Sequence, residues 1–248
     1  MFDHVTIRVS DLDASRAFYA LALGEPTHVS THFTEWDEFG ISRERGDRPL
    51  TRNLHVAFGV PGRDAVDAWW RTLVDAGYES DGEPGPRPQY SESYYGAFVR
   101  DPDGNSVEAV HHDTTRGEGI DHLWLRSRDV AAQRAFYEAA APIVAISLAR
   151  ERRDFAQFRF TDRTGSFSFV DDSASVTENV HLAFAAPDVA TVEEFHRALT
   201  SAGYRDNGGP GERPEYHHGY HAAFVLDPGG HNVEAVFHDR SSGNPPAD

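Results

Sequence analysis

The sequence contains no cysteine, so it can form no disulfide, no thiolate metal ligand and no cysteine nucleophile. It also contains no lysine, because all 23 basic residues are arginine, and this excludes Schiff-base chemistry and a P-loop lysine. No apolar run approaches the roughly 18 residues that a membrane-spanning helix needs. Histidine, carboxylate, tyrosine and arginine side chains remain as the groups that could carry chemistry.

Acidic residues dominate the charge of the 248-residue chain. Asp and Glu number 40, and the formal net charge of −17 repels phosphate backbones, which argues against nucleic-acid binding. The start of the chain, Met1–Val9, enters a strand pattern at once and lacks the basic and apolar regions of a secretion signal. We therefore expect a cytoplasmic monomer or homodimer that binds a small-molecule substrate and no membrane.

The second half of the chain repeats the first. The largest matching segments, 126 residues apart, are NLHVAFGVP with NVHLAFAAP (Asn53–Pro61, Asn179–Pro187) and the longer pair Arg87–Asp113 and Arg213–Asp239. Upstream, Phe2–Asp11 matches Ile120–Asp129 at an offset of 118, so the second half carries an insertion of eight residues. The repeat predicts one domain over 1–113 and another over 119–240, with a polar linker between them and a flexible tail over 241–248.

Each half reads as two similar strand–helix–strand units. The strands are expected near Val5–Val9, Trp36–Ser42, Leu54–Val60, Tyr94–Arg100 and Ser106–His112, and the helices near Ala14–Leu23 and Ala65–Ala76. Asp11 is placed to cap the first helix. The pattern predicts an α+β protein of four βαβββ modules, which form two open β-barrel-like halves with the helices outside.

Strand alternation places two histidines and one glutamate of each half away from the expected core. In the first strand Val5 and Ile7 alternate with His4, so His4 lies on the face that the helix does not cover. The candidate ligands are His4, His55 and Glu108 in the first half and His122, His181 and Glu234 in the second. Two imidazoles and a carboxylate leave coordination positions free, which suits Fe(II), Mn(II), Zn(II) or Ni(II).

A lone strand histidine is more often a packed or surface residue than a ligand, and duplicated copies are not independent evidence. The metal prediction therefore depends on all three residues recurring on one face, with the glutamate 53 residues after its strand histidine in both halves.

Further polar and aromatic residues are expected near these ligands. Tyr94 and Tyr220 share a strand face with Phe98 and Phe224, and this face is taken as the pocket side, where the two phenylalanines would contact the substrate. The tyrosine hydroxyls could donate a proton to a metal-bound oxygen, or the tyrosines could pack at the rim. His218 or His217 could act as a general base, or could be an exposed loop residue. His112 and His238 are candidate hydrogen-bond partners of the ligands. Arg87 and Arg213 could hold a substrate carboxylate, or could be ordinary surface residues.

Three motifs occur in both halves and together resemble the vicinal-oxygen-chelate superfamily. They are DHV and DHL (Asp3–Val5, Asp121–Leu123), the HVAF-type strand (His55–Phe58, His181–Phe184) and DPDGN…VE with DPGGHNVE (Asp101–Glu108, Asp227–Glu234). That superfamily includes glyoxalase I, bleomycin-resistance proteins, fosfomycin-modifying enzymes and type I extradiol dioxygenases. The resemblance implies paired βαβββ modules and a metal that an oxygenated substrate chelates through two oxygens.

The sequence departs from the glyoxalase I pattern at its fourth ligand. That ligand is a glutamate on the last strand of the first module, but Phe39–Ser42 and Phe167–Val170 contain no carboxylate. Three ligands suit the dioxygenase and fosfomycin-enzyme patterns better, so the first hypothesis is a metalloenzyme of the ring-cleaving dioxygenase kind. The alternatives are an antibiotic-resistance protein that binds or modifies a drug, and a non-catalytic small-molecule-binding protein that keeps the metal for structure.

The sequence leaves two ways to pair the modules. Adjacent pairing joins His4 with His55 and Glu108, whereas swapped pairing joins His4 with His181 and Glu234. Loop-closure entropy separates the two options poorly. Single-chain dioxygenase-like members of the superfamily use adjacent pairing, and we expect it here.

Overall fold

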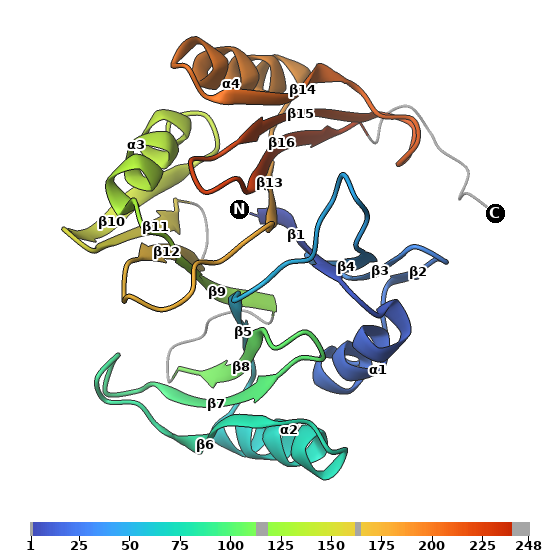
Figure 1. The fold of residues 1–248 in the computed structure, drawn as a ribbon, viewed down its shortest axis with the longest axis vertical. Coiled ribbons are helices and arrows are strands. Elements are labelled where there is room, and N and C mark those ends of the chain that lie inside the picture. The colour runs from blue at the N-terminus through green and yellow to red at the C-terminus, as the bar shows by residue number, and fades with distance from the viewer. Residues whose placement is uncertain (1, 113–118, 162–164, 240–248) are drawn as a thin grey trace.

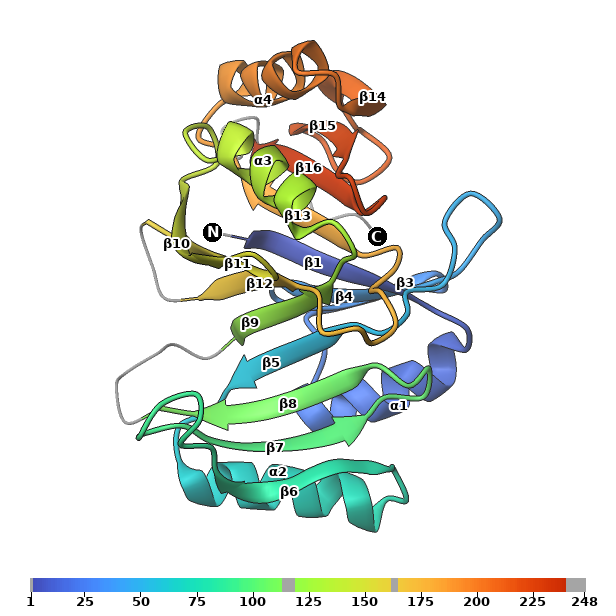
Figure 2. The same cartoon turned by 60° about the vertical axis from the view of Figure 1, so that its left-hand side comes forward.

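The computed structural model describes residues 2–112, 119–161 and 165–239 (Figure 1). The predicted linker lies outside these described residues except for Gly119, and the predicted tail over 241–248 lies outside them entirely. The four helices of the described residues lie on the outside of the molecule, and strands fill the space between them (Figures 1 and 2). None of the helices in the described ranges is long and apolar enough to span a membrane.

Each half contains two modules of one strand, one helix and three further strands. The first half has β1 (Phe2–Val9), α1 (Leu12–Leu23), β2 (His28–Val29), β3 (Phe33–Trp36), β4 (Phe39–Arg43), β5 (His55–Gly59), α2 (Arg63–Asp75), β6 (Ser80–Pro86), β7 (Tyr95–Arg100) and β8 (Ser106–His111). The second half has β9 (Gly119–Arg126), α3 (Val130–Ala140), β10 (Ile146–Arg152), β11 (Phe155–Phe160), β12 (Ser166–Val170), β13 (His181–Ala185), α4 (Val189–Ser201), β14 (Arg205–Glu212), β15 (Tyr220–Leu226) and β16 (Asn232–His238).

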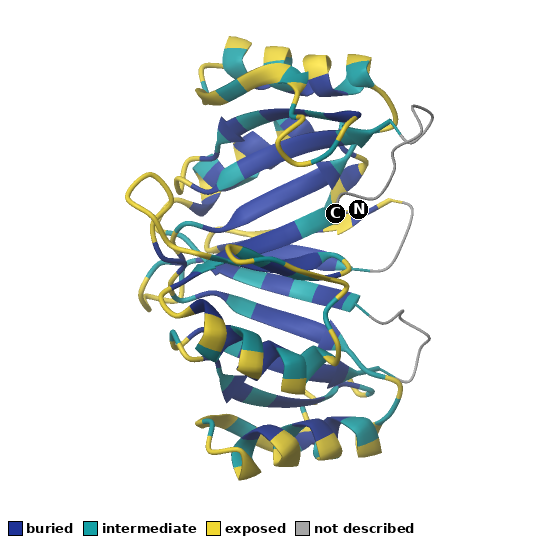
Figure 3. Cartoon of the chain, turned by 90° about the vertical axis from the view of Figure 1, so that its right-hand side faces the viewer, coloured by how far each residue is buried: buried dark blue, intermediate teal, exposed yellow. Residues whose placement is uncertain are grey.

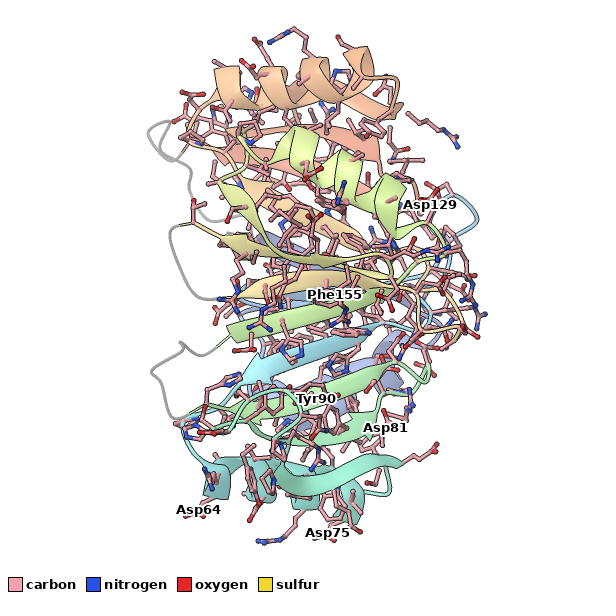
Figure 4. All side chains as sticks on the ribbon, turned by 90° about the vertical axis from the view of Figure 1, so that its left-hand side faces the viewer. Asp64, Asp75, Asp81, Tyr90, Asp129 and Phe155 are labelled. Carbon is pink, nitrogen blue, oxygen red and sulfur yellow. The ribbon has the colours of Figure 1, made fainter. Side chains whose placement is uncertain are left out.

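Aspartates begin three of the four helices. The Asp11 carboxylate accepts from the backbone N–H groups of Asp13 and Ala14, which confirms the predicted cap. Asp129 (labelled in Figure 4) and Asp188 cap α3 and α4 in the same way. Each carboxylate satisfies N–H groups that have no partner within the helix, and this fixes where the helix starts.

The expected core faces are confirmed. Val5, Ile7 and Val9 on β1 are fully buried, and so are Leu123 and Leu125 on β9. Exposed positions gather on the outer faces of the helices, while buried positions follow the strands (Figure 3). The ligand candidates therefore lie on the opposite side of their strands from the helix-covered core, as alternation predicts.

The strands form two eight-stranded sheets, and each sheet takes one module from each half of the chain. The order is β14-β15-β16-β13-β1-β4-β3-β2 in one sheet and β10-β11-β12-β9-β5-β8-β7-β6 in the other. The central contacts are antiparallel, between β1 and β13 and between β5 and β9. The α+β class is confirmed, but the expectation that each open barrel-like unit is built from one half of the chain is wrong, because the modules are exchanged between halves.

A reciprocal junction ties the exchanged modules together. Arg52 and Glu178 each donate a backbone N–H to the carbonyl of the other, at 3.2 and 3.0 Å. The next residues in this region, Asn53 and Asn179, have left-handed backbones with φ of 56° and 57°. Each asparagine side chain donates to a carbonyl of the opposite half. The segments that lead into β5 and β13 thus cross each other, and each delivers its strand to the sheet that contains the other half's first strand.

The two modules of one half also stay in contact, through their helices. Helix α1 packs on α2, and Trp69 of α2 donates its indole N–H to the carbonyl of Ala22. The hydroxyl of Tyr19 donates to Asp101 at 3.0 Å. Because helix packing joins modules within a half and strand pairing joins modules across halves, the whole described chain shares one main hydrophobic core.

Candidate metal centres

Two clusters of side chains that could hold a metal ion lie at the two central strand pairs. One contains His55, Glu108 and His122, here called the His55 site, and the other contains His4, His181 and Glu234, here called the His181 site. In each cluster the possible ligand atoms all lie within 4.8 Å of one another. All six residues predicted as ligands are therefore brought together, three at a time.

The pairing differs from the expectation. His4 meets His181 and Glu234, not His55 and Glu108, so the prediction of adjacent pairing is wrong. The physical reason is the strand order. β1 lies beside β13, with His4 opposite Ala183, and β9 lies beside β5, with His122 opposite Ala57. Each site is built across the junction between halves.

In the His55 site the three ligand atoms face one another. The Nε2 atom of His55 is 3.1 Å from Oε2 of Glu108 and 3.3 Å from Nε2 of His122. The Nε2 atom of His122 is 3.5 Å from the same carboxylate oxygen. The glutamate is almost completely buried, so its charge needs a compensating cation or proton.

The His181 site has similar dimensions. The Nε2 atom of His181 is 2.9 Å from Oε2 of Glu234 and 3.1 Å from Nε2 of His4, and His4 Nε2 is 3.7 Å from that oxygen. Ligand atoms that share one ion at about 2.1 Å lie roughly 3.0 to 3.5 Å apart. Both clusters therefore have the spacing of a single-ion site.

A β-bulge next to one histidine of each site supplies a carboxylate. Phe2 and His4 pair with consecutive residues of β13, which leaves Asp3 as the extra residue, and Asp121 is the extra residue of β9. The bulge breaks the alternation, so Asp3 Oδ1 lies 2.8 Å from Nδ1 of His4 and Asp121 Oδ1 lies 2.8 Å from Nδ1 of His122. Each aspartate holds the Nδ1 proton of its histidine and leaves Nε2 free to bind a metal.

Sequence reasoning missed this role of Asp3 and Asp121, because strict alternation places them on the core face. The signal was present, since an aspartate precedes the histidine in both DHV and DHL. A bulge cannot be located from alternation alone.

The strand histidine of the His55 site is held in the same way. His55 Nδ1 lies 3.2 Å from the hydroxyl of Ser106, and that hydroxyl donates to Asp81 (labelled in Figure 4) at 2.7 Å. Because the serine proton goes to Asp81, the serine oxygen accepts from His55 Nδ1. Both histidines of this site then direct lone pairs at Glu108, and three acceptor atoms converge once the carboxylate is ionised. This donor set fits a divalent cation.

The His181 site is held differently. Asn207 donates to Oδ1 of Asn232, and the Asn232 amide nitrogen lies 2.8 Å from Nδ1 of His181. In this arrangement His181 carries its proton on Nε2 and donates it to Glu234. The three residues also fit a divalent cation, but the cation must displace that proton and the Asn232 amide must turn.

Burial shifts the titration of the ligands. Burial lowers the pKa of His55 to about 4, so this imidazole is neutral at neutral pH. Burial raises the pKa of Glu108 to about 7, against the opposing charge of His122 and the hydrogen bond from Tyr94. For His4, burial alone would lower the pKa, but the hydrogen bond to Asp3 and the charge of Glu234 outweigh it and raise the pKa.

The two predicted tyrosines contact the ligand carboxylates. The Tyr94 hydroxyl donates to Oε1 of Glu108 at 2.6 Å, and the Tyr220 hydroxyl donates to Oε1 of Glu234 at 2.7 Å. Burial and the neighbouring carboxylate raise both tyrosine pKa values, so the hydroxyls stay protonated and keep donating. The tyrosines leave the other carboxylate oxygen to face the two histidines.

The predicted substrate-binding residues form a layer beside each site. The Phe98 ring lies 5.8 Å from the His55 ring, and the Arg87 guanidinium lies 5.5 Å from the centre of Phe98. Phe224 and Arg213 repeat this arrangement beside His181. Arg87 donates to the carbonyls of Glu83 and Pro86. Among the described residues no carboxylate forms an ion pair with either arginine.

Of the two loop histidines, His218 is exposed and pairs with Glu212 at 2.8 Å. His217 instead contacts His238 at 2.9 Å, and His238 contacts Asp3 at 3.0 Å. His112 occupies the matching position beside Asp121, at 3.4 Å. His238 and His112 therefore lie beside the aspartates that hold His4 and His122.

Comparison with known proteins agrees with this geometry. The profile of the Glyoxalase/Bleomycin resistance protein/Dioxygenase superfamily matches residues 1–109 and again 119–235. No curated protein matches the chain. Among solved structures, glyoxalase I from Zea mays is similar with a TM-score of 0.70 and 20% identity over 96% of this chain and 92% of that one. A candidate dioxygenase from Bacillus subtilis has a TM-score of 0.66 and 16% identity over 96% of this chain and 85% of that one.

At these identities the structural similarities establish the fold alone, whereas the sequence profile covers both halves, including all six clustered His and Glu side chains. The chain belongs to the Glyoxalase/Bleomycin resistance protein/Dioxygenase superfamily, with two superfamily domains in tandem.

Proposed function

We propose that this protein is a divalent-metal-dependent enzyme that acts on a small oxygenated substrate, and that its chemistry is of the ring-cleaving dioxygenase kind. The observation that carries the proposal is the His55 site, where two imidazole lone pairs and one buried carboxylate oxygen converge. A bound metal would supply a Lewis acid there and, as Fe(II) or Mn(II), oxygen chemistry.

The number of protein ligands favours this reaction class over a glyoxalase I reaction. Each cluster in the described chain offers two histidines and one carboxylate. In glyoxalase I-like members a fourth ligand comes from the last strand of the first module, which here is β4 or β12. On β4 the residue opposite Thr6 is Gly40, and on β12 the residue opposite Trp124 is Ser168, so neither of these positions adds a carboxylate. Two histidines and one carboxylate with open positions are typical of non-haem Fe(II) oxygenases.

The chain's own residues have separable roles in this proposal. Tyr94 orients Glu108, while Asp121 and Ser106 fix the two imidazoles by binding their Nδ1 protons. Phe98 gives the substrate an apolar surface next to His55. Arg87 donates two N–H groups to the carbonyls of Pro86 and Glu83. Its remaining N–H groups could bind a carboxylate of the substrate.

The test begins with metal. The purified chain is loaded separately with Fe(II), Mn(II), Zn(II) and Ni(II), and metal content and X-ray absorption are measured. We expect up to two equivalents per chain in sites of nitrogen and oxygen ligands. X-ray absorption without imidazole ligation would contradict the metal sites.

Reaction class is tested next, by O₂ consumption of the Fe(II)- and Mn(II)-loaded protein with a panel of catechols. The control is the double variant Glu108→Gln/Glu234→Gln, which keeps the side-chain volume but removes both carboxylates. O₂ uptake that requires both the metal and the glutamates supports the proposal. Turnover of an epoxide with a thiol, or tight drug binding without turnover, would instead support the antibiotic-resistance alternative.

A further inference from the structure

A continuous chain of hydrogen bonds runs from an exposed loop to the His181 site. Asp3 accepts from Nδ1 of His4 at 2.8 Å through one oxygen and from Nε2 of His238 at 3.0 Å through the other. His238 Nδ1 then lies 2.9 Å from Nε2 of His217. His217 Nδ1 lies 2.8 Å from the backbone carbonyl of His218.

The contacts of this chain fix how many protons the two outer imidazoles carry. A carbonyl oxygen can only accept, so His217 Nδ1 must bear a proton. Each Asp3 oxygen faces one imidazole nitrogen, and with both oxygens accepting, His238 Nε2 bears a proton too. The contact between the two rings needs a third proton. Two neutral imidazoles carry only two, so the pair satisfies all its hydrogen bonds when it holds one additional proton and a charge of +1.

The surroundings of the pair are suited to that charge. The nearest carboxylate is Asp3, whose Oδ2 lies 3.0 Å from Nε2 of His238. The carboxylate of Glu35 on β3 also interacts with the charge of His238. Tyr220 on β15 packs edge-on against His238, with ring centroids 5.0 Å apart, and remains neutral.

The other site differs at the outer end of this arrangement. Asp121 holds His122, and His112 occupies the position of His238. The residue that corresponds to His217 in the repeat is Ser91, which has no imidazole. The two sites therefore share the aspartate and the inner histidine, but the two-imidazole pair is particular to the His181 site.

We propose that His217 and His238 form an imidazole pair that shares one additional proton, and that this pair positions Asp3 and, through Asp3, the metal-binding nitrogen of His4. The effect on metal affinity rests on the proposed function, whereas the protonation of the pair does not. His217 and His238 are positioning residues, because neither contacts a ligand atom directly.

The first experiment uses the metal-free full-length chain. Histidine ¹⁵N–¹H NMR at neutral pH counts the ring protons of His217 and His238 and follows the Nδ1 proton of His4. We expect three ring protons on the pair and a His4 proton that is protected from exchange with water. Two neutral rings in the wild-type protein would overturn the proposal, whether or not the protein binds metal.

Three variants separate positioning from other effects. His217→Ser introduces the residue found at Ser91 and should expose the His4 proton to exchange. His217→Gln keeps a donor for His238 Nδ1 and should restore the protection. His218→Ser, at the exposed neighbour, is the matched control and should behave like wild type.

Metal titration gives the second readout. His217→Ser should weaken binding at the His181 site by about threefold to tenfold, near the low end of the effect of groups next to a ligand, and leave the His55 site unchanged. His217→Gln should bind within about twofold of wild type. If His217→Ser leaves both the His4 proton and the affinity unchanged, or if Gln fails to rescue either, the positioning role is wrong. A protein with three ring protons on the pair but no bound metal would contradict the proposed function alone.

Discussion

Tyr94 and Glu108 are joined by a 2.6 Å hydrogen bond in which the phenol occupies one carboxylate oxygen and leaves the other to face two histidines. The bond fixes the rotation of a buried carboxylate, because both of its oxygens then have defined partners.

We expect Tyr94→Phe to weaken metal binding at the His55 site by about tenfold, because the carboxylate loses a partner and can rotate. Competition titration with a metal-binding dye measures the affinity. Tyr220→Phe is the matched variant and should weaken only the His181 site. If Tyr94→Phe keeps full affinity but loses turnover, the phenol acts on the substrate and not on the ligand.

Metal binding at the His55 site should depend on pH through Glu108. Its pKa of about 7 in the metal-free protein means that the carboxyl is mostly protonated below pH 7, so a metal must displace a proton there. Affinity should fall by about tenfold per pH unit below about pH 7 and level off above it. His55, with a pKa of about 4, does not compete in this range. An affinity that stays constant between about pH 5.5 and pH 7.5 would show that Glu108 is ionised before metal arrives.

The exchange of modules predicts which site each histidine serves. His4→Ala should empty the site that contains Glu234 and leave metal at the site that contains Glu108. His122→Ala should have the reverse effect. Anomalous scattering at the two positions distinguishes the sites. Loss of metal next to Glu108 in His4→Ala would mean that the modules pair within each half.

The aromatic cluster in which Phe2 of the first half packs against the second half should dominate the stability of the fold. Phe2 from the first half lies within 5.7 Å of Phe160, Phe167 and Phe184 from the second, measured between ring centroids. Phe167 is fully buried, so Phe167→Ala should lower the free energy of unfolding by about 3 to 5 kcal/mol. Urea denaturation followed by circular dichroism measures this loss. Leu21→Ala, at a side chain that is 45% exposed, is the control and should cost less than about 1 kcal/mol.

Much of the site could be predicted from local pattern. The alternation of Leu54, Val56 and Phe58 with His55 identifies the face of each strand, and burial of these three side chains confirms it. The repeat then identifies the second set of ligands. These inferences succeed because the face of a strand depends only on its own sequence.

Module pairing could not be predicted in the same way. The edge at which β1 meets β13 is made of backbone hydrogen bonds, which any strand can offer to any other. The choice depends on where the segments around Asn53 and Asn179 cross, and that is a property of the assembled molecule. The bulges at Asp3 and Asp121 were missed for a related reason, because an extra residue in one strand is defined only against its partner.

The exchange of modules also determines what a single half can do by itself. Residues 1–113 contain a full set of His4, His55 and Glu108, yet in the intact chain these side chains belong to two different sheets. Since β1 repeats β9 and β5 repeats β13, a lone half that keeps this strand pairing would build a site by placing its β1 against the β5 of a second copy. With the pairing of the intact chain retained, a gene truncated after the first repeat would encode a twofold-symmetric dimer with two identical centres.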